Sequence, residues 1–290
     1  MDVLSFFYNE YVYGGHMAGT ALMGMVFTIS FIEGSPLDLP ILLIAYFVPV
    51  IVYSYDHYRD IKTDKITNPD RAEYLEKKFA YYPFIIGTYI SILVGLILFG
   101  GQSIVEIFAF TAIVVGGGLL YAVSFKKLTK YIPAYKNIYV SFEWAIAATL
   151  LLSMYNQQSA TLITLLMFTF IFLKYFTNTI FCDLKDIETD RQKGLKTIPV
   201  LIGFDKTIIF LTVLSIITVV PLFYGVYHQV LPVWILLFVI FAVYDITYIL
   251  LAYKNMIAIK WSKYTFIADI EIPLWPIVLV PLVRVCEVVV

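Results

Sequence analysis

Two clusters of acidic residues stand out in a chain that otherwise carries few charges. Each cluster contains three regularly spaced aspartates: Asp56, Asp60 and Asp64 in the first, and Asp183, Asp186 and Asp190 in the second. On a helix, spacings of three or four residues place all three carboxylates of a cluster on one face. Like charges at these spacings repel each other, so the arrangement destabilises the helix unless a cation lies among the carboxylates.

The chemistry of both clusters suits Mg²⁺ and a diphosphate. Mg²⁺ prefers a few carboxylates together with water and phosphate oxygens. Basic residues interleave with the acids and suit the remaining phosphate charge. They are Arg59, Lys62 and Lys65 in the first segment and Lys185, Arg191, Lys193 and Lys196 in the second. The alternative is a pair of solvated loops with ion pairs along a helix face, but the pattern occurs twice, which favours the metal site.

The composition indicates that membrane-spanning helices position these clusters. Of the 290 residues, 61% are hydrophobic and 14% are charged, with a mean hydropathy of +0.85, whereas soluble domains contain about 25% charged residues. One soluble core of this size cannot bury so much apolar surface, and the same numbers exclude a disordered chain. The two cysteines are too few for a disulfide framework. We therefore predict an all-α integral membrane protein.

Apolar stretches long enough to span a membrane recur along the whole chain. We predict nine transmembrane helices, at roughly His16–Ile32, Leu37–Tyr55, Tyr82–Phe99, Ile104–Phe125, Ile138–Met154, Ala160–Cys182, Thr207–Tyr227, Leu231–Tyr253 and Ile270–Val285. The last stretch contains Pro273, Pro276 and Pro281, which lack a backbone donor and predict a kinked or broken helix. The sequence shows no linker and no low-complexity segment between these stretches. We therefore predict a single polytopic membrane domain over residues 1–290.

The basic residues predict how the chain crosses the membrane. The links after the second, fourth, sixth and eighth spans carry 18 of the 20 Lys and Arg residues, whereas the short links between them carry none. By the positive-inside rule, both acidic clusters and the amino terminus lie on the cytoplasmic side, and the carboxyl terminus lies outside. In a prokaryote this membrane is the plasma membrane. The aromatic first 15 residues suit an interfacial helix, and we expect no signal peptide, because no basic stretch precedes the first apolar run.

The second acidic cluster resembles a motif of the UbiA-type intramembrane prenyltransferase superfamily. That family carries the pattern Asp-x-x-Asp-x-x-x-Asp after its sixth helix. The matching residues here are Asp183, Asp186 and Asp190, followed by Gly194, Thr197, Pro199 and Gly203. A further stretch, similar to the family's tyrosine-basic-Lys-Asn segment, contains Tyr121, Lys127, Lys136, Asn137 and Trp144. The resemblance covers most of the chain and implies the family's bundle of nine helices around a central cavity.

The first acidic cluster departs from the family's pattern, Asn-Asp-x-x-Asp-x-x-x-Asp. Its last two aspartates match, but Asp56 stands in the place of the asparagine and His57 in the place of the first aspartate. Asn68 replaces an arginine of the family, while Arg71 keeps its place. One diphosphate-binding arginine of the family is therefore missing and one metal ligand differs. These departures affect the choice of acceptor substrate more than the prediction of the fold. From the sequence, His57 is a metal ligand, a base or an exposed histidine.

The resemblance also implies a function and a set of site residues. The function is Mg²⁺-dependent transfer of a prenyl group from a prenyl diphosphate, through ionisation to an allylic carbocation, to an aromatic (quinone-precursor-type) or lipid acceptor within the membrane. The implied catalytic residues are Asp60, Asp64, Asp183, Asp186 and Tyr121, and the implied Mg²⁺ ligands are the four of these that are aspartates together with Asp56 and Asp190. The implied substrate-binding residues are Arg71, Lys127, Lys193 and Asp190. The expected partners are the prenyl diphosphate, a hydrophobic acceptor and membrane lipid, and not nucleic acid.

Polar residues inside the spans leave alternatives open. Lys174 is costly in hydrocarbon and must face the cavity or a partner, and Asn178 lies one turn away. Both are candidate substrate-binding residues, although a buried structural bond is the favoured alternative, as it is for Asp245. Glu143 is either a cavity acid or an interfacial group. Two other functions remain: a transporter whose path includes Lys174 and Asp245, and a non-catalytic relative that binds isoprenoid diphosphates.

Overall fold

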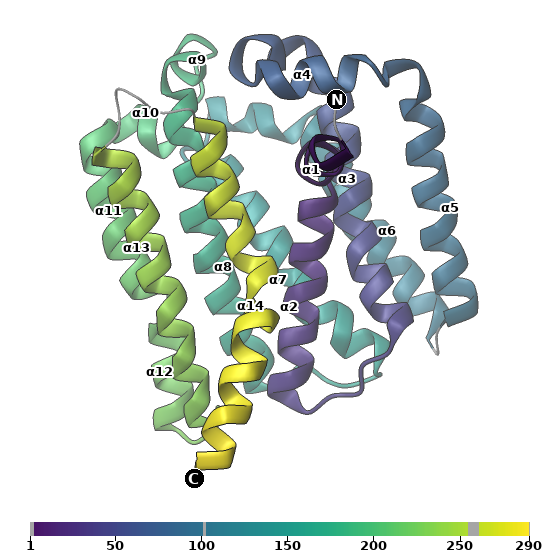
Figure 1. Ribbon diagram of the computed structural model, residues 1–290, viewed down its shortest axis with the longest axis vertical. Helices are drawn as coiled ribbons and strands as arrows, with labels where there is room; N and C mark the ends of the chain where they lie inside the picture. Colours follow the sequence, from purple (N-terminus) through teal and green to yellow (C-terminus); the bar gives the residue numbers. More distant parts are fainter. Residues whose placement is uncertain (1–2, 101–102, 255–260, 290) are drawn as a thin grey trace.

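Helices make up almost all of this computed structural model, which describes residues 3–100, 103–254 and 261–289 (Figure 1). No strand occurs within these ranges. Nine helical segments among the described residues are long and apolar enough to cross a membrane. The predicted all-α fold with nine membrane spans is therefore confirmed, and the chain is an integral membrane protein.

The spanning segments follow the predicted stretches closely. Five of them lie in single α-helices: α2 (His16–Glu33), α3 (Leu39–Thr67), α6 (Ile104–Val123), α7 (Tyr135–Tyr155) and α14 (Trp261–Val289). The other four join consecutive helices: η1 (Phe79–Tyr81) with α5 (Tyr82–Gly100), α8 (Leu162–Asp183) with η3 (Leu184–Asp186) and α9 (Ile187–Gln192), α11 (Phe204–Ile217) with α12 (Val220–Tyr227), and the 3₁₀ helix η4 (Val233–Phe238) with α13 (Val239–Lys254). The seventh span divides just before Pro221, which has no amide proton to continue the hydrogen-bond ladder.

The ninth span is not broken, although its prolines predict a kink or a break. The helix α14 continues through Pro273, Pro276 and Pro281. Membrane helices tolerate proline where neighbouring helices and local adjustments satisfy the freed backbone groups. Close packing of α2 supports this stretch, since a Cβ added at Gly24 would lie 3.4 Å from the carbonyl oxygen of Ile272. The small residue allows the two backbones to approach each other.

The two helices that lead to the acidic clusters begin at capping residues. The side chain of Asp38 accepts a hydrogen bond of 3.1 Å from the amide of Ile41 at the start of α3. Thr161 precedes α8 and forms a capping box with Thr164. These caps satisfy amide groups that the first helical turn leaves unpaired. Each helix then crosses the bundle and carries its acidic residues at the opposite end.

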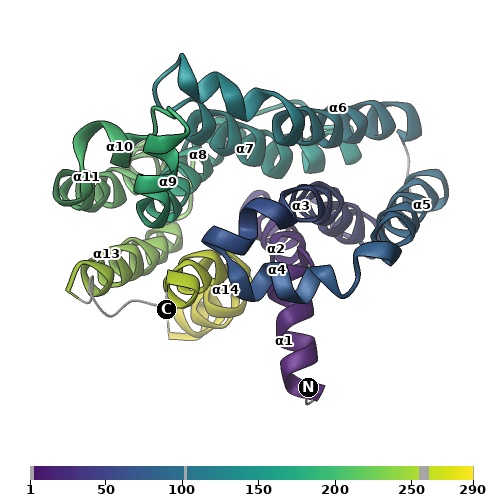
Figure 2. The same ribbon diagram turned by 90° about the horizontal axis from the view of Figure 1, so that it is seen from above.

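Short helices lie at the end of the bundle that holds the amino terminus, and the carboxyl terminus lies at the other end (Figure 1). These short helices are α1 (Val3–Tyr13), α4 (Pro69–Glu76), η1 (Phe79–Tyr81), η2 (Phe125–Lys130), η3 (Leu184–Asp186), α9 (Ile187–Gln192) and α10 (Ile198–Ile202). Viewed in Figures 1 and 2, α1 lies across the bundle axis, which is the orientation of an interfacial helix.

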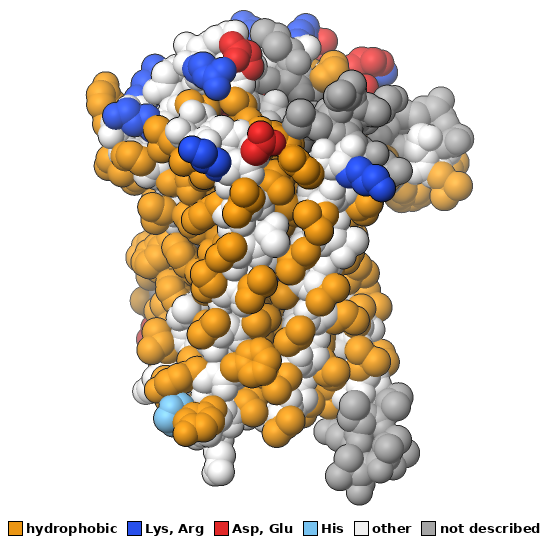
Figure 3. All heavy atoms as spheres, turned by 90° about the vertical axis from the view of Figure 1, so that its left-hand side faces the viewer, with side chains coloured by type: hydrophobic (Ala, Val, Ile, Leu, Met, Phe, Trp, Pro, Cys, Tyr) orange, Lys and Arg blue, Asp and Glu red, His pale blue; other side chains and the backbone are white. Residues whose placement is uncertain are grey.

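Two facing rows of helices surround the centre of the molecule (Figure 2). One row contains α6, α7 and α8, and the other contains α3, α2 and α14. On the face in Figure 3, Lys and Arg side chains gather at the end with the short helices, and hydrophobic side chains cover the surface below them. A charged end above an apolar belt is the surface expected of a protein in a bilayer.

Candidate active site

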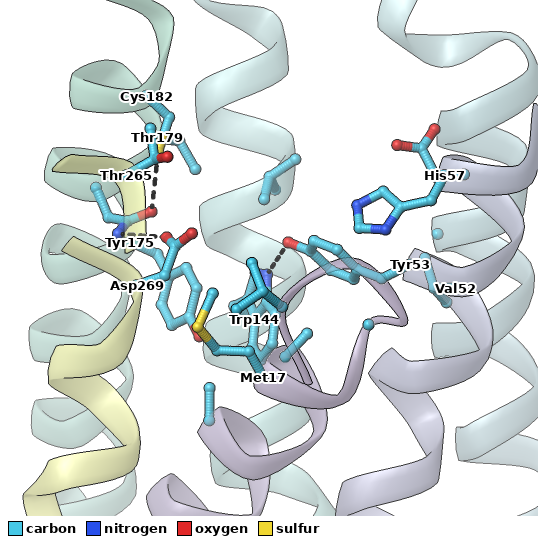
Figure 4. Close-up of a pocket in the computed structure, with 18 of the residues that line it drawn as sticks. Met17, Val52, Tyr53, His57, Trp144, Tyr175, Thr179, Cys182, Thr265 and Asp269 are labelled. Carbon is cyan, nitrogen blue, oxygen red and sulfur yellow. Dashed lines mark hydrogen bonds between the residues drawn. The ribbon is translucent and has the colours of Figure 1, made fainter. Parts of the chain in front are cut away.

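A cavity of about 410 Å³ lies between the two rows of helices. One end of it is charged, and the residues that line this end are Asp56, His57, Asn68, Arg71, Lys136, Asp183, Lys185 and Asp186. The apolar and aromatic lining residues include Met17, Ala18, Ala21, Val52, Tyr53, Trp144, Tyr175 and Ile272. Figure 4 shows Met17, Trp144 and Tyr175 deeper in the cavity than His57. Both acidic segments therefore contribute charged groups to one end of a cavity whose remainder is largely apolar.

The three aspartates of the first cluster follow one face of α3, as predicted, because α3 continues without a break to Thr67. Asp56 lines the cavity, whereas Asp60 and Asp64 lie outside the lining that the structure describes. Lys126 of η2 pairs with the first two carboxylates, with its Nζ 2.6 Å from Asp60 Oδ2 and 3.5 Å from Asp56 Oδ1. The ammonium group offsets the repulsion between these like charges.

Arg71 of α4 binds the last aspartate of this cluster. Its Nε and Nη2 atoms lie 2.8 and 2.7 Å from the two carboxylate oxygens of Asp64, which is buried. Such a bidentate pair fixes the plane of the guanidinium group. The Nη1 atom of Arg71 lies 3.0 Å from Nε2 of His57. The structure therefore places His57 against a cavity-lining arginine.

The second acidic cluster crosses a change of helix type. The helix α8 ends at Asp183, the 3₁₀ helix η3 follows, and α9 carries Asp190, so the single helix face predicted for this cluster is interrupted. Lys136 of α7 bridges the two ends of the cluster, with its Nζ 2.6 Å from Asp183 Oδ1 and 3.7 Å from Asp190 Oδ2. Asn137 donates a hydrogen bond of 2.9 Å to the other oxygen of Asp183. A single lysine thus holds the turn of the chain after α8 against α7.

The charged end of the cavity contains oxygen donors of the type that Mg²⁺ prefers. Asp56 from α3, Asp183 from α8 and Asp186 from η3 all line it. Within the described ranges, no three His, Cys, Asp or Glu side chains lie close enough together to hold a metal ion. Lys126 forms an ion pair with Asp60 of the first cluster, and Lys136 forms one with Asp183 of the second. The donor chemistry fits Mg²⁺, and lysines balance the acidic charge in this structure.

Three of the predicted substrate-binding residues lie away from this cavity. Lys127 on η2 and Lys193 after α9 have exposed side chains. Lys174 lies within α8, with its Nζ 2.5 Å from Asp245 Oδ2 and 2.6 Å from Glu271 Oε1. The side chains of this triad are at most 3% exposed. The contacts of Lys174 suit the structural alternative that its sequence position left open.

Aromatic side chains form the wall below the charged end. Tyr121, predicted to be catalytic, lines the cavity, and its ring stacks on Tyr139 with 5.2 Å between ring centroids. Trp144 stacks on Tyr175 with 4.4 Å between centroids. Its Nε1 donates a hydrogen bond of 3.3 Å to the hydroxyl of Tyr53 (Figure 4). We call Tyr53, Trp144 and Tyr175 the aromatic floor.

The sequence model of the UbiA prenyltransferase family matches residues 80–269, well over half of the chain. This chain belongs to the UbiA prenyltransferase family. The resemblance of its motifs to this family is thereby confirmed. The digeranylgeranylglyceryl phosphate synthase of Sulfolobus acidocaldarius is 28% identical to it over 201 residues. That match covers 66% of each chain, so the chain spans slightly less than two thirds of this relative's length.

Solved structures of UbiA homologs share the fold. A UbiA homolog from Aeropyrum pernix K1, in its apo form, has a TM-score of 0.67 at 15% identity, covering 90% of this chain and 97% of that chain. A UbiA homolog from Archaeoglobus fulgidus bound to GPP and Mg²⁺ has a TM-score of 0.62 at 15% identity, covering 94% and 99% of the two chains. The predicted UbiA-like bundle of membrane helices is therefore confirmed.

Sequence reasoning assigns no individual site role to three charged residues that line the cavity of this UbiA-family protein: Lys136, Lys185 and Asp269. Lys136 belongs to the Lys-Asn pair of the family segment, and Lys185 lies within the second acidic motif, so the sequence carries a signal for both. Asp269 belongs to neither motif, and its signal is a lone carboxylate beside the ninth apolar stretch. Asn178, predicted to bind substrate, also lines the cavity and donates a hydrogen bond of 3.0 Å to Asp269.

Proposed function

We propose that this UbiA-family enzyme transfers a prenyl group from a prenyl diphosphate to a hydrophobic acceptor within the membrane, and that the transfer requires Mg²⁺. The observation that carries this proposal is the cavity, because acidic side chains of both motifs and several cations share one end of it while aromatic and apolar residues line the rest. Homologs from Archaeoglobus fulgidus bound to GPP and Mg²⁺, and to DMAPP and Mg²⁺, support the substrate class.

The diphosphate fits the charged end. Arg71, Lys136 and Lys185 line it and can donate charge-assisted hydrogen bonds to phosphate oxygens. The proposed Mg²⁺ ligands are the six aspartates of the two motifs, of which Asp56, Asp183 and Asp186 line the cavity. Mg²⁺, when bound, stabilises the negative charge that develops on the leaving diphosphate.

The prenyl tail fits the deeper part of the cavity, where burial of each methylene contributes about 0.8 kcal/mol. When the carbon–oxygen bond ionises, the ring faces of Tyr121 and of the aromatic floor can stabilise the allylic carbocation through cation–π interactions. The helices that enclose the cavity also keep bulk water away from the cation, which would otherwise form an alcohol. The chain thus supplies both the charge and the dry surroundings that this chemistry needs.

We also propose the sidedness that the basic residues predict. The end with the short helices faces the cytoplasm, because 18 of the 20 Lys and Arg residues lie in the links at that side. The amino terminus then lies inside the cell, and the diphosphate enters from the cytoplasm. No observation favours a transporter, since Lys174 and Asp245 pair with each other rather than line the cavity.

Pyrophosphate release tests the proposal. Purified protein in lipid nanodiscs receives radiolabelled geranylgeranyl diphosphate and a mixture of glyceryl-phosphate lipids and aromatic acceptors, with Mg²⁺ or with EDTA. We expect Mg²⁺-dependent release, reduced about 100-fold or more in Asp183→Asn and Asp186→Asn. The matched control is Glu188→Gln, because Glu188 lies in the same motif with a side chain that is 68% exposed and paired with Arg191. Equal release in EDTA, or full activity in both aspartate variants, would contradict the assignment.

A further inference from the structure

A carboxylate outside both acidic motifs projects into the cavity. Asp269 lies on α14, across from α8, and Figure 4 shows its side chain pointing from α14 into the cavity. The amide of Asn178 donates a hydrogen bond of 3.0 Å to its Oδ1 atom. The thiol of Cys182 donates a weak hydrogen bond of 3.9 Å to the Oδ1 atom of Asn178. This contact fixes the amide so that its NH₂ group faces Asp269.

Asp269 is half-buried, and its second carboxylate oxygen differs from those of the buried acids. Asp64, Asp183 and Asp245 each pair with a basic side chain within 2.7 Å. For Asp269, the described part of the chain contains no ion pair, and Asn178 contacts only its Oδ1 atom. A carboxylate within a membrane span that contacts no basic side chain is costly, so such groups usually serve a function. The Oδ2 atom is thus available to a ligand in the cavity.

Two other acids near the cavity are less suited to meet a ligand. Glu271, two residues further along α14, is held by Lys174 at 2.6 Å and by the indole of Trp275 at 3.2 Å. Glu143 lines the cavity but lies against Gly117, where a Cβ would be 2.8 Å from its Oε1 atom, and it also faces a smaller neighbouring cavity. Asp269 alone among these three combines a cavity position with a donor that fixes one of its oxygens.

We infer that Asp269 accepts the proton of the attacking group, and that the acceptor substrate presents a neutral hydroxyl group to it. This inference rests on the proposed prenyl transfer. The bond between C1 of the prenyl group and the diphosphate oxygen breaks, and its electron pair leaves with the diphosphate. A lone pair of the acceptor hydroxyl forms the new bond to C1, and the hydroxyl proton passes to Oδ2 of Asp269. Asn178 holds the Oδ1 atom throughout.

A positioned carboxylate favours a hydroxyl acceptor over an aromatic carbon nucleophile. A neutral hydroxyl group beside Asp269 can donate its proton to that carboxylate, and an anionic group elsewhere on the acceptor, such as the phosphate of a glyceryl phosphate, fits toward the cavity-lining cations Arg71, Lys136 and Lys185. A carbon nucleophile loses its proton from a cationic intermediate, which needs only a weak base, whereas a hydroxyl group gains directly from a positioned carboxylate. Thr265, Phe266 and Ile272 continue the wall beside Asp269 and suit a lipid chain. We therefore assign the acceptor to the class of hydroxyl-bearing lipids.

The experiment separates chemistry at the donor from chemistry at the acceptor. Purified protein in nanodiscs with Mg²⁺ and geranylgeranyl diphosphate receives either a mono-geranylgeranylated glyceryl phosphate or a hydroxybenzoate, and prenylated product and pyrophosphate are measured. Asp269→Asn keeps the oxygen that Asn178 binds but removes the base. We expect it to lower kcat for transfer to the glyceryl phosphate about 100-fold or more, with acceptor-independent pyrophosphate release and binding of a thio-diphosphate analogue within threefold of wild type. Asp269→Glu restores at least a tenth of the transfer.

Several outcomes would overturn the inference. They are transfer by Asp269→Asn within threefold of wild type, loss of transfer in Glu143→Gln but not in Asp269→Asn, and wild-type transfer to the hydroxybenzoate but not to the glyceryl phosphate. Failure of the proposed function itself looks different, because wild-type protein would then release no pyrophosphate in an Mg²⁺-dependent manner. Glu73→Gln serves as the carboxylate control, since Glu73 lies on α4 with a side chain that is 74% exposed. Binding of the thio-diphosphate shows that each variant is folded.

Discussion

His57 holds Arg71 from the side opposite to the Asp64 carboxylate. The Nη1 atom of Arg71 lies 3.0 Å from Nε2 of His57, and Nδ1 of the same ring lies 2.9 Å from the carbonyl oxygen of Tyr13. A guanidinium group can only donate, so Nε2 accepts this hydrogen bond and Nδ1 carries the proton that it donates to Tyr13. His57, which stands where the family has its first aspartate, thus connects α1 to the arginine at the charged end of the cavity.

This contact predicts that His57 acts on the diphosphate through Arg71. We expect His57→Ala to raise KM for the prenyl diphosphate about tenfold, because one charge-assisted hydrogen bond that orients Arg71 is lost. We expect His57→Gln to recover part of this effect, since its amide oxygen can accept from Arg71. In a double-mutant cycle with Arg71→Ala, the two effects should be strongly non-additive. Additive effects of the two substitutions on KM would contradict the proposed role of His57 in orienting Arg71. So would a lower yield of folded His57→Ala protein whose KM equals that of wild type.

The buried triad of Lys174, Asp245 and Glu271 predicts a large effect on stability. Its single ammonium group lies within 2.6 Å of a carboxylate oxygen of each acid. Lys174→Met leaves the two carboxylates without a cation, and removal of one partner of a buried ion pair costs about 3–5 kcal/mol. We expect a marked fall in the Tm of the purified protein, and partial recovery in Lys174→Met/Glu271→Gln. A raised KM for the prenyl diphosphate at unchanged Tm would instead support the substrate-binding role that its sequence position allows.

Glu10 near the carboxyl end of α1 predicts a pH dependence of stability. Burial raises the pKa of Glu10, but hydrogen bonds from three neighbours outweigh it and lower the pKa from 4.5 to about 2. The neighbours are His16, Lys78 and Tyr74. Because the folded state has the lower pKa, the stabilising contribution is complete above about pH 4.5 and is lost as the pH falls toward 2.

Thermal unfolding between pH 7 and pH 3 measures this contribution. Glu10→Gln cannot titrate, so we expect its Tm to be lower than that of wild type at pH 7 and the difference to shrink as the pH falls. Glu73→Gln removes an exposed carboxylate and should follow the wild-type curve closely. Parallel curves for wild type and Glu10→Gln over the whole range would show that Glu10 contributes no pH-dependent stability.

The membrane spans and the placement of the acidic motifs follow from the sequence because they depend on local patterns. Hydrophobic stretches determine the spans, since each must satisfy its own backbone hydrogen bonds in the bilayer. The spacing of Asp56, Asp60 and Asp64 fixes their common face once α3 continues beyond the membrane. These predictions need no knowledge of which helices are neighbours.

The partners of the charged residues depend on packing and are not contained in such patterns. Lys136 reaches both Asp183 and Asp190 because the chain turns through η3 at the end of α8, and no spacing rule specifies that turn. Asp269 joins the cavity only because α14 packs across from α8. A lone carboxylate in an apolar stretch indicates that some partner or ligand exists, but it does not indicate which.

The aromatic floor predicts a determinant of prenyl chain length. Trp144 and Tyr53 line the main cavity and also a second cavity of about 40 Å³ behind it. Removal of the indole in Trp144→Ala joins the two spaces, so that a longer tail can be buried. We expect the ratio of kcat/KM for geranylgeranyl over geranyl diphosphate to rise about tenfold, because each additional buried methylene contributes about 0.8 kcal/mol.

The control for this prediction keeps an aromatic ring in place. Trp144→Phe still presents a ring to Tyr175, whose centroid lies 4.4 Å from that of the indole, and leaves the two cavities separated. We expect its substrate ratio to stay within twofold of wild type. Because Trp144→Ala also removes a buried stacking contact, rates are normalised to the fraction of protein that binds a thio-diphosphate analogue. A ratio that changes equally in both variants, or in neither, would show that the prenyl tail does not extend toward Trp144.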